Sequence, residues 1–134
     1  MTEICSSANL SETGVDTFEN IVLTYASGAQ ASIFSSVTCP TNRRGVVYGE
    51  KGYAEVGNVN NYEYLRIYNT DHELIEETLC PPQVTGFEYE LAACAEAISN
   101  GWTQCPDAPH EMSITMMELM DKIRSPWGLE YPEL

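Results

Sequence analysis

The chain has 134 residues, 43% of them hydrophobic and 19% charged, which is the composition of an ordinary globular domain. Twenty acidic residues against six basic ones give a formal net charge of −14. Nucleic acids and anionic membranes are bound through clustered Lys and Arg, so this balance argues against both as partners. The length fits a single domain over residues 1–134 that can bury a core without disulfides or metal.

The cysteines favour a reducing compartment. They are Cys5, Cys39, Cys80, Cys94 and Cys105. Their number is odd and no two form a CxxC pair, whereas a zinc site usually needs two close pairs and a disulfide framework an even count. Residues 1–10 lack the basic and apolar segments of a signal peptide, and no apolar run is long enough to span a membrane. We therefore expect reduced thiols and a cytoplasmic location.

Strands are predicted for the first part of the chain. Residues 2–10 are rich in small and β-compatible side chains, and residues 16–25 alternate between apolar and polar positions. Residues 26–28 (Ala-Ser-Gly) fit a type I turn closed by a left-handed glycine, so residues 29–37 are expected to return as the next strand.

The three-residue turn fixes the register of this hairpin. It pairs Tyr25 with Ala29, Leu23 with Ala31 and Ile21 with Ile33. These side chains form one apolar face, which we expect to carry the core. The other face mixes small polar side chains with phenylalanines, which is unusual for a surface that meets only water. We predict an interface there, with the candidate residues Phe18, Val22, Thr24, Ser32 and Phe34.

Four more strands and two helices complete the pattern. The strands are expected at residues 44–49, 53–56, 63–68 and 73–79. The hydrophobic spacing then changes to the helical period, with one apolar stripe starting at Phe87 and a second running from Met112 to Ile123. Strands followed by helices predict an α+β fold, with an open, largely antiparallel β-sheet and helices packed on one face.

Motifs for catalysis and cofactor binding are absent from the sequence. It contains no G-x-G, no GxxxxGK and no GxSxG. His72 and His110 are each followed by Glu, but the second His of a zinc-protease motif is missing. We therefore predict no catalytic, cofactor-binding or metal-binding residue. Tyr89 and Glu90, near the start of the first helix, are candidates for a substrate pocket, although packing and a solvated carboxylate also explain them.

Seven short segments together carry a family resemblance. They are Gly14-Val15-Asp16, Tyr25-Ala26-Ser27-Gly28-Ala29, Tyr48-Gly49-Glu50-Lys51-Gly52, Gly86-Phe87-Glu88-Tyr89-Glu90, Pro109-His110-Glu111, Met120-Asp121-Lys122-Ile123-Arg124 and Trp127-Gly128-Leu129-Glu130-Tyr131-Pro132. In this order, and over nearly the whole chain, they resemble the C-terminal domain of the glucose-fructose oxidoreductase, inositol dehydrogenase and rhizopine-catabolism (Gfo/Idh/MocA) family. Within that family, the dimeric dihydrodiol dehydrogenase branch is the most similar.

The resemblance implies a two-domain NAD(P)-dependent oxidoreductase that acts on sugars, polyols or related alcohols. An N-terminal Rossmann domain would hold NAD or NADP, while the C-terminal sheet would cover the active site and build the oligomer with its open face. The family's glycine fingerprint, catalytic-lysine segment and Asp/His motif have no match in this chain, and Lys51 belongs to a tight turn. No catalytic or cofactor-binding residue is therefore carried over.

We expect this chain to be the substrate-side and oligomerisation domain of such an enzyme. Without the Rossmann domain it would be inactive, and it would form a homodimer through the open sheet face. One alternative is a free-standing binding or scaffold module that reuses the fold. Another is a cofactor-free enzyme with a pocket between the helices and the sheet.

Overall fold

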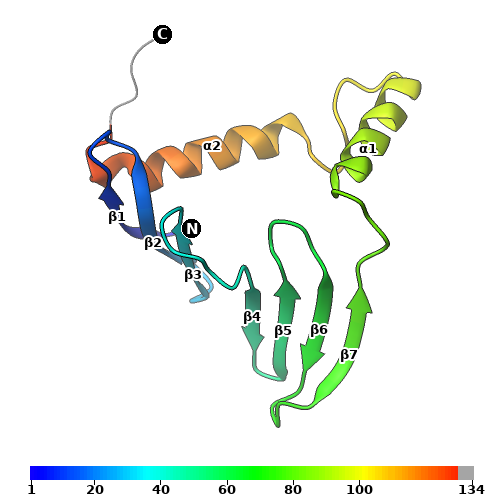
Figure 1. Ribbon diagram of the computed structural model, residues 1–134, viewed down its shortest axis with the longest axis horizontal. Coiled ribbons are helices and arrows are strands. Elements are labelled where there is room, and N and C mark those ends of the chain that lie inside the picture. Colours follow the sequence, from blue (N-terminus) through cyan, green and yellow to red (C-terminus); the bar gives the residue numbers. More distant parts are fainter. Residues whose placement is uncertain (130–134) are drawn as a thin grey trace. The chain divides into compact units, whose positions relative to one another are not determined.

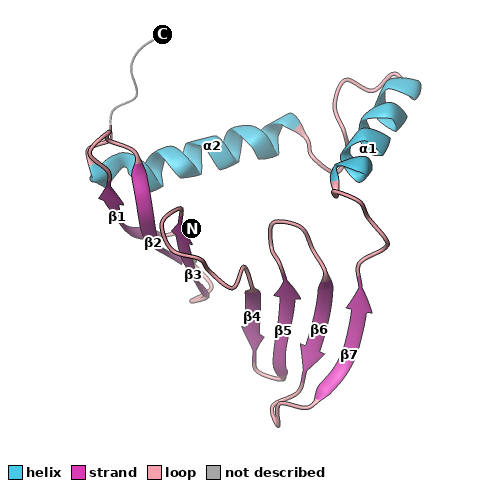
Figure 2. Cartoon of the chain, viewed as in Figure 1, coloured by secondary structure: helices cyan, strands magenta, loops and turns pink. Residues whose placement is uncertain are grey.

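The computed structural model describes residues 1–129 (Figure 1). Within these residues, seven strands precede two α-helices and a short 3₁₀ helix. Figure 2 distinguishes the helices from the strands by colour. The chain divides into two compact units: residues 1–41 together with the segment from Pro106 onward, and residues 42–105. Each unit contains one antiparallel sheet, and each is described by itself below.

The first unit is built on a three-stranded sheet. Its strands are β1 (Glu3–Leu10), β2 (Asp16–Thr24) and β3 (Gln30–Ser36), in the order β1-β2-β3. The predicted register is confirmed, because Ile21 pairs with Ile33 and Leu23 with Ala31. At the turn, the Tyr25 amide donates to the Ala29 carbonyl at 2.9 Å and Gly28 takes the left-handed conformation, with φ at 87°.

Helix α2 (His110–Arg124) and the 3₁₀ helix η1 (Ser125–Trp127) cover one face of this sheet. The buried core consists of Ile21, Leu23 and Ile123. Partly buried side chains pack around it: Ile4, Ala31, Leu119 and Trp127. The core therefore lies on the predicted face of the hairpin, the face that carries Ile21, Leu23 and Ala31. Of the aromatic C-terminal segment, Trp127 docks on the sheet, whereas the predicted contribution of residues 130–132 lies outside the described residues.

A hydroxyl links the sheet to the end of α2. Ser6 Oγ donates to the Ile123 carbonyl at 2.6 Å and lies 3.1 Å from Trp127 Nε1, from which it accepts a hydrogen bond. One small polar side chain thus satisfies two groups at the C-terminal end of the helix, where backbone carbonyls lose their helical partners. This contact and the apolar core hold the same end of α2.

The second unit contains a four-stranded sheet followed by a helix. The elements are β4 (Gly45–Gly49), β5 (Gly52–Gly57), β6 (Tyr64–Tyr68), β7 (Leu74–Leu79) and α1 (Phe87–Ser99). The strands are antiparallel in the order β4-β5-β6-β7. All seven strands and both helices were predicted from the sequence, and the strand bounds differ from the predicted ones by at most one residue, as is usual at element ends.

A carboxylate closes the N-terminal end of α1. Glu88 accepts hydrogen bonds from the backbone amides of Val84, Thr85 and Gly86. These bonds, first among them the one from Val84, hold the pKa of Glu88 at about 2. The amides at the start of the helix are thus satisfied from within the chain. Farther along α1, most of the apolar stripe that begins at Phe87 is exposed.

The predicted α+β class with open antiparallel strands and helices is confirmed, and the strands are divided between two sheets. The segment between β3 and β4 explains the division. Pro40 has no amide hydrogen to donate, and Arg43 adopts a left-handed conformation with φ at 50°, so this segment cannot continue a strand. None of the described helices is long and apolar enough to cross a bilayer.

Candidate functional site

The second sheet carries a row of tyrosines on one face. The strand register places Tyr48 opposite Tyr53 and Tyr53 opposite Tyr68. The rings of Tyr53 and Tyr68 stack, with centroids 4.8 Å apart and planes 14° apart, and the Tyr48 centroid lies 5.8 Å from that of Tyr53. We call this the tyrosine face; it consists of Tyr48, Tyr53, Glu55, Tyr64, Arg66 and Tyr68.

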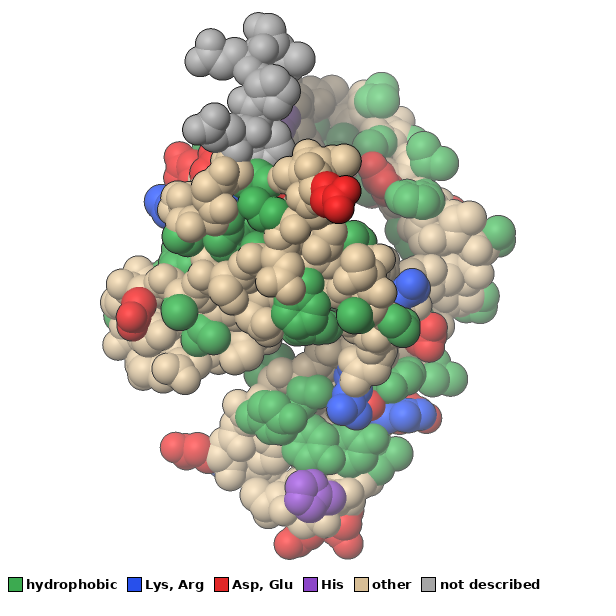
Figure 3. Space-filling view, turned by 60° about the vertical axis from the view of Figure 1, so that its left-hand side comes forward, with side chains coloured by type: hydrophobic (Ala, Val, Ile, Leu, Met, Phe, Trp, Pro, Cys, Tyr) green, Lys and Arg blue, Asp and Glu red, His purple; other side chains and the backbone are tan. Residues whose placement is uncertain are grey.

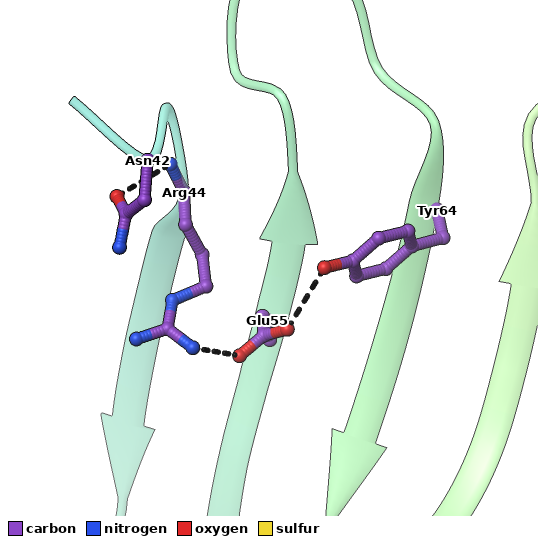
Figure 4. Close-up of polar contacts among 4 residues, drawn as sticks. All are labelled: Asn42, Arg44, Glu55 and Tyr64. Carbon is purple, nitrogen blue, oxygen red and sulfur yellow. Dashed lines mark hydrogen bonds and ion pairs between the residues drawn. The ribbon is translucent and has the colours of Figure 1, made fainter. Parts of the chain in front are cut away.

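A buried glutamate lies at the centre of the tyrosine face (Figure 4). Glu55 is only 8% exposed, and its two carboxylate oxygens have different partners. Arg44 Nη1 lies 2.9 Å from Oε2, and the Tyr64 hydroxyl donates to Oε1 at 3.0 Å. The hydrogen bond to Glu55 raises the pKa of the Tyr64 hydroxyl, and burial and the carboxylate charge add to this effect.

The backbone of β5 leaves room for this contact. A Cβ at Gly57 would collide with the Tyr64 ring, so glycine is required for the ring to lie across β5 and reach Glu55. On the other side, the Arg66 guanidinium lies 4.0 Å from the centre of the Tyr64 ring. Arg66 Nε also donates to Glu77 Oε1 on β7 at 2.6 Å. The polar side chains of β5, β6 and β7 and of Arg44, just before β4, are thus held by one another.

This network is suited to recognition rather than to proton transfer. Both oxygens of Glu55 are engaged by Arg44 and Tyr64, so the carboxylate is not aimed at a substrate atom. The fixed rings and guanidinium groups form a preorganised surface. Sequence periodicity did not identify Glu55 as a site residue, although the cross-strand order Glu55, Arg66, Glu77 is an alternation of charge that the hairpin register could have revealed.

The opposite face of the second sheet is apolar on β4, β5 and β6, and on β7 it carries Glu76 and Thr78. It carries Val47, Ala54, Val56, Leu65 and Ile67, of which Val47 is 72% exposed. An apolar pocket at one end of the sheet extends from Val56 and Leu65 to Cys80 and Pro81. We call the sheet face that carries Val47, Ala54, Val56, Leu65 and Ile67 the apolar face.

The first unit contains a pair of interacting carboxyl groups. A bulge between β1 and β2 leaves Thr17 unpaired, so Asp16 opposes Leu10 while Glu19 opposes Ala8. Both carboxyls thereby lie on the face covered by α2. Their mutual hydrogen bond, together with burial and the charge of Asp16, raises the pKa of Glu19 to about 7. The same bond lowers the pKa of Asp16, with a further contribution from the positive charge of Arg124 on α2.

This pair gives the first unit a specific pH dependence. The pKa of Glu19 rises from its ordinary value of 4.5 to about 7, so the stability it contributes is complete below pH 4.5 and is lost as the pH rises through 7. Asp16 acts in the opposite sense, because its pKa is lowered. The stability that it contributes is present above its ordinary pKa of 3.8 and is lost only as the pH falls below that value. We expect the urea midpoint to fall between about pH 5 and about pH 8.

The variant Glu19→Gln should remove most of this fall in the urea midpoint. The matched control is Glu3→Gln, which removes one negative charge from the exposed face of the same sheet. An unchanged pH profile in Glu19→Gln would contradict the assignment.

The predicted interface residues are brought together on the uncovered face of the first sheet. Phe18 and Phe34 form an edge-to-face pair with ring centroids 4.7 Å apart, and Phe34 is 46% exposed. Val22 and Ser32 are paired across β2 and β3 on the same face, and Thr24 lies at the end of β2. The geometry therefore fits a surface patch, and its role as an interface remains a prediction.

The two predicted pocket residues, Tyr89 and Glu90, both lie in the first turn of α1. The Tyr89 hydroxyl donates to the Pro82 carbonyl at 3.2 Å, which fastens the first turn of α1 to the segment before it. Glu90 is exposed in the same turn. Neither residue lines the pocket beside the apolar face or the one around the turn between β4 and β5. Their role in substrate binding therefore remains a prediction.

The described residues do not fit a dinucleotide or a metal. Pyrophosphates are typically held at a glycine-rich helix start, but Glu88 already takes the amides before α1, and the segment before α2 (Asp107-Ala108-Pro109) contains no glycine. Among residues 1–129, no group of three or more His, Cys, Asp and Glu side chains could hold a metal ion. No disulfide joins any two of the five cysteines.

Together, the elements define an α+β protein with open antiparallel sheets. No protein-family model matches the chain, and no curated protein matches its sequence. Among solved structures it is similar to the crystal structure of the aldose-aldose oxidoreductase from Caulobacter crescentus complexed with glycerol, with a TM-score of 0.72 and 19% identity. The match covers 91% of this chain but only 37% of that enzyme. At this identity, the similarity establishes a shared fold with part of an oxidoreductase.

Proposed function

We propose that this chain is the C-terminal, substrate-side and oligomerisation domain of an NAD(P)-dependent oxidoreductase that acts on sugars, polyols or related diols. The observation that carries the proposal is the structural match over 91% of the chain to 37% of an aldose-aldose oxidoreductase. The seven sequence segments of the family resemblance support it independently, because they were identified without the structure. In this proposal the chain is cytoplasmic, and a Rossmann domain supplies the nucleotide site and the catalytic residues.

The described residues explain why the domain would depend on such a partner. They contain a recognition-type face and an apolar face, but no helix start that fits a pyrophosphate. The Rossmann domain would then hold the nucleotide and supply the catalytic residues, and this chain would contribute the wall that covers the substrate. Tyr89 and Glu90 are the proposed contributors to that wall.

Titration with NADH and NADPH, followed by nicotinamide fluorescence, tests the domain assignment. We expect no saturable binding to this chain alone. Saturable binding of either nucleotide would falsify the assignment and favour an enzyme that is complete in itself. If the DNA upstream encodes a Rossmann domain in frame, the protein that contains both parts should bind the nucleotide and show dehydrogenase activity. The absence of such a coding region would favour a free-standing binding or scaffold module.

The proposed homodimer contact on the first sheet has its own test. Phe34→Asp would place a charge beside Phe18 in the exposed aromatic pair, so we expect the sedimentation coefficient to fall to that of a monomer. Val37→Asp is the matched control, because Val37 is 82% exposed and follows β3. A dimer that persists in Phe34→Asp would exclude this patch from the contact.

A further inference from the structure

Helix α1 ends in an Asn-Gly pair. Among the asparagines of the sequence, Asn100 is the one that is followed by glycine. Any other residue at the following position carries a Cβ that crowds its own amide nitrogen, whereas glycine leaves that nitrogen free to approach the asparagine side chain. A Cβ added at Gly101 would meet nothing within 4 Å, so the space around this peptide bond is open as well.

The folded end of α1 holds both nitrogens of this pair. Asn100 is the C-cap residue, with φ at −86° and ψ at −1°, and its Nδ2 donates to the Glu96 carbonyl at 2.9 Å. Gly101 takes the left-handed conformation, with φ at 67°, and its amide donates to the Ile98 carbonyl at 3.0 Å. While this cap is closed, the amide nitrogen of Gly101 is therefore kept from reacting with the Asn100 side chain.

The cap has little packing to hold it closed. The buried residue of α1 is Ala97, whereas Leu91 and Ile98 are 70% and 78% exposed. Figure 3 shows exposed hydrophobic side chains in green across the visible face of the molecule. The last turn of α1 also has no basic side chain that would interact favourably with the helix dipole. A helix end with so few buried contacts opens by local unfolding more readily than a packed core.

We propose that Asn100 is a site of spontaneous deamidation, gated by the opening of the last turn of α1. In the open state the amide nitrogen of Gly101 attacks Cγ of Asn100, and a new C–N bond closes a succinimide ring. The bond from Cγ to Nδ2 breaks, and the amide proton of Gly101 leaves with Nδ2 as ammonia. Water then opens the ring at either carbonyl and leaves an aspartate or an isoaspartate. The reaction needs no reactant other than water, and it does not depend on the function proposed above.

The product keeps the helix end open. A carboxylate has no hydrogen to donate to the Glu96 carbonyl, and it lies at the negative end of the helix dipole. It also follows the Glu96 side chain by four residues, a spacing at which like charges repel each other on a helix. In the isoaspartate product the main chain is longer by a methylene group, so the amides of Gly101 and Trp102 lose the carbonyls with which they pair. Deamidation thus makes a reversible opening permanent.

Incubation of the full chain at mildly alkaline pH, followed by peptide mapping with mass spectrometry and detection of isoaspartate, tests the site. In the folded chain, Asn100 should be deamidated faster than Asn69, whose side chain is held by hydrogen bonds in the turn between β6 and β7. In the urea-unfolded chain, Asn100 should react faster still, because the cap no longer protects it. A rate at Asn100 no higher than that at Asn69 in the folded chain would overturn the site, and equal rates at Asn100 in the folded and unfolded chains would overturn the gate.

Two alanines of α1 test the gate without changing the Asn-Gly pair. Ala97→Gly lowers the helix propensity of the last turn and loosens its packing, so the deamidation rate of Asn100 in the folded chain should rise at least about fivefold. Ala92→Gly is the matched control, because it makes the same change at an exposed position nearer the middle of the helix and should raise the rate less than about twofold. Equal deamidation rates in the two variants would overturn the gate at the last turn.

Hydrogen exchange measures the consequence for the helix end. The Trp102 amide donates to the Ala97 carbonyl at 2.9 Å, so its exchange should become faster in the chain that has been incubated and deamidated. Asn100→Gln keeps a side-chain amide but cyclises far more slowly, so the same incubation should leave the exchange of Trp102 unchanged in that variant. Unchanged exchange at Trp102 in the deamidated chain would overturn the proposed effect on α1.

Discussion

Replacement of Leu23 by Ala is expected to lower the free energy of unfolding of the first unit by about 3 kcal/mol. Leu23 is 4% exposed, and within residues 1–129 the other buried members of its core cluster are Ile21 and Ile123. Truncation removes the transfer free energy of the lost methyl groups and leaves a cavity that few neighbours can fill. Since folded domains are stable by only about 5–15 kcal/mol, this loss should bring the unit close to unfolding.

Urea unfolding followed by Trp127 fluorescence measures this effect, because Trp127 packs against the core and bonds to Ser6. A Trp102→Phe background leaves Trp127 as the single tryptophan. The control is Val22→Ala, which removes a neighbouring aliphatic side chain from the uncovered face and should cost less than about 1 kcal/mol in the monomer. Similar losses for the two variants would mean that α2 does not bury the face that contains Leu23.

The hairpin of the first unit shows what the sequence could determine. A three-residue turn ending in Gly28 and alternating apolar residues are enough to predict the register, the covered face and the exposed aromatic patch. These features follow from local chemistry, because the turn type sets the register and the two-residue period of a strand sets the face. The helix bounds followed in the same way from apolar spacing.

The carboxyl pair shows where that reasoning stops. Strict alternation places positions 16 and 19 on opposite faces of β2, and only the bulge at Thr17 brings Asp16 and Glu19 together. A bulge is a departure from the period, so periodicity cannot locate it. The division into two sheets escapes the sequence for a related reason: Pro40 indicates the end of a strand, but which strands then pair in one sheet depends on contacts between distant parts of the chain.

The Glu55 network belongs to the same class of long-range features. Its members come from β5, from β6 and from the residue just before β4, and Gly57 is needed so that Tyr64 can reach across β5. Each residue alone looks like an ordinary strand residue. Only the pairing of β5 with both β4 and β6 shows that the carboxylate is buried between a guanidinium and a phenol, and the same pairing separates the tyrosine face from the apolar face.

Replacement of Glu55 by Ala is expected to lower the free energy of unfolding of the second unit by about 2 kcal/mol. The variant removes two hydrogen bonds to a carboxylate and leaves the Tyr64 hydroxyl without its acceptor. Arg44 is about half exposed and can be solvated by water, which keeps the loss below that of breaking a fully buried ion pair. Urea unfolding followed by circular dichroism provides the measurement.

Glu77→Ala is the matched control for this prediction, because Glu77 also pairs with an arginine on the same face but its side chain is 35% exposed. Water and salt screen that pair, so its loss should cost less than about 1 kcal/mol. Combining Glu55→Ala with Tyr64→Phe should cost about 1 kcal/mol less than the sum of the single variants, since both remove the same hydrogen bond. Additive losses of unfolding free energy, or equal losses for Glu55→Ala and Glu77→Ala, would show that burial of Glu55 does not hold the tyrosine face together. Any preorganisation of that face would then have to come from the stacking of its rings alone.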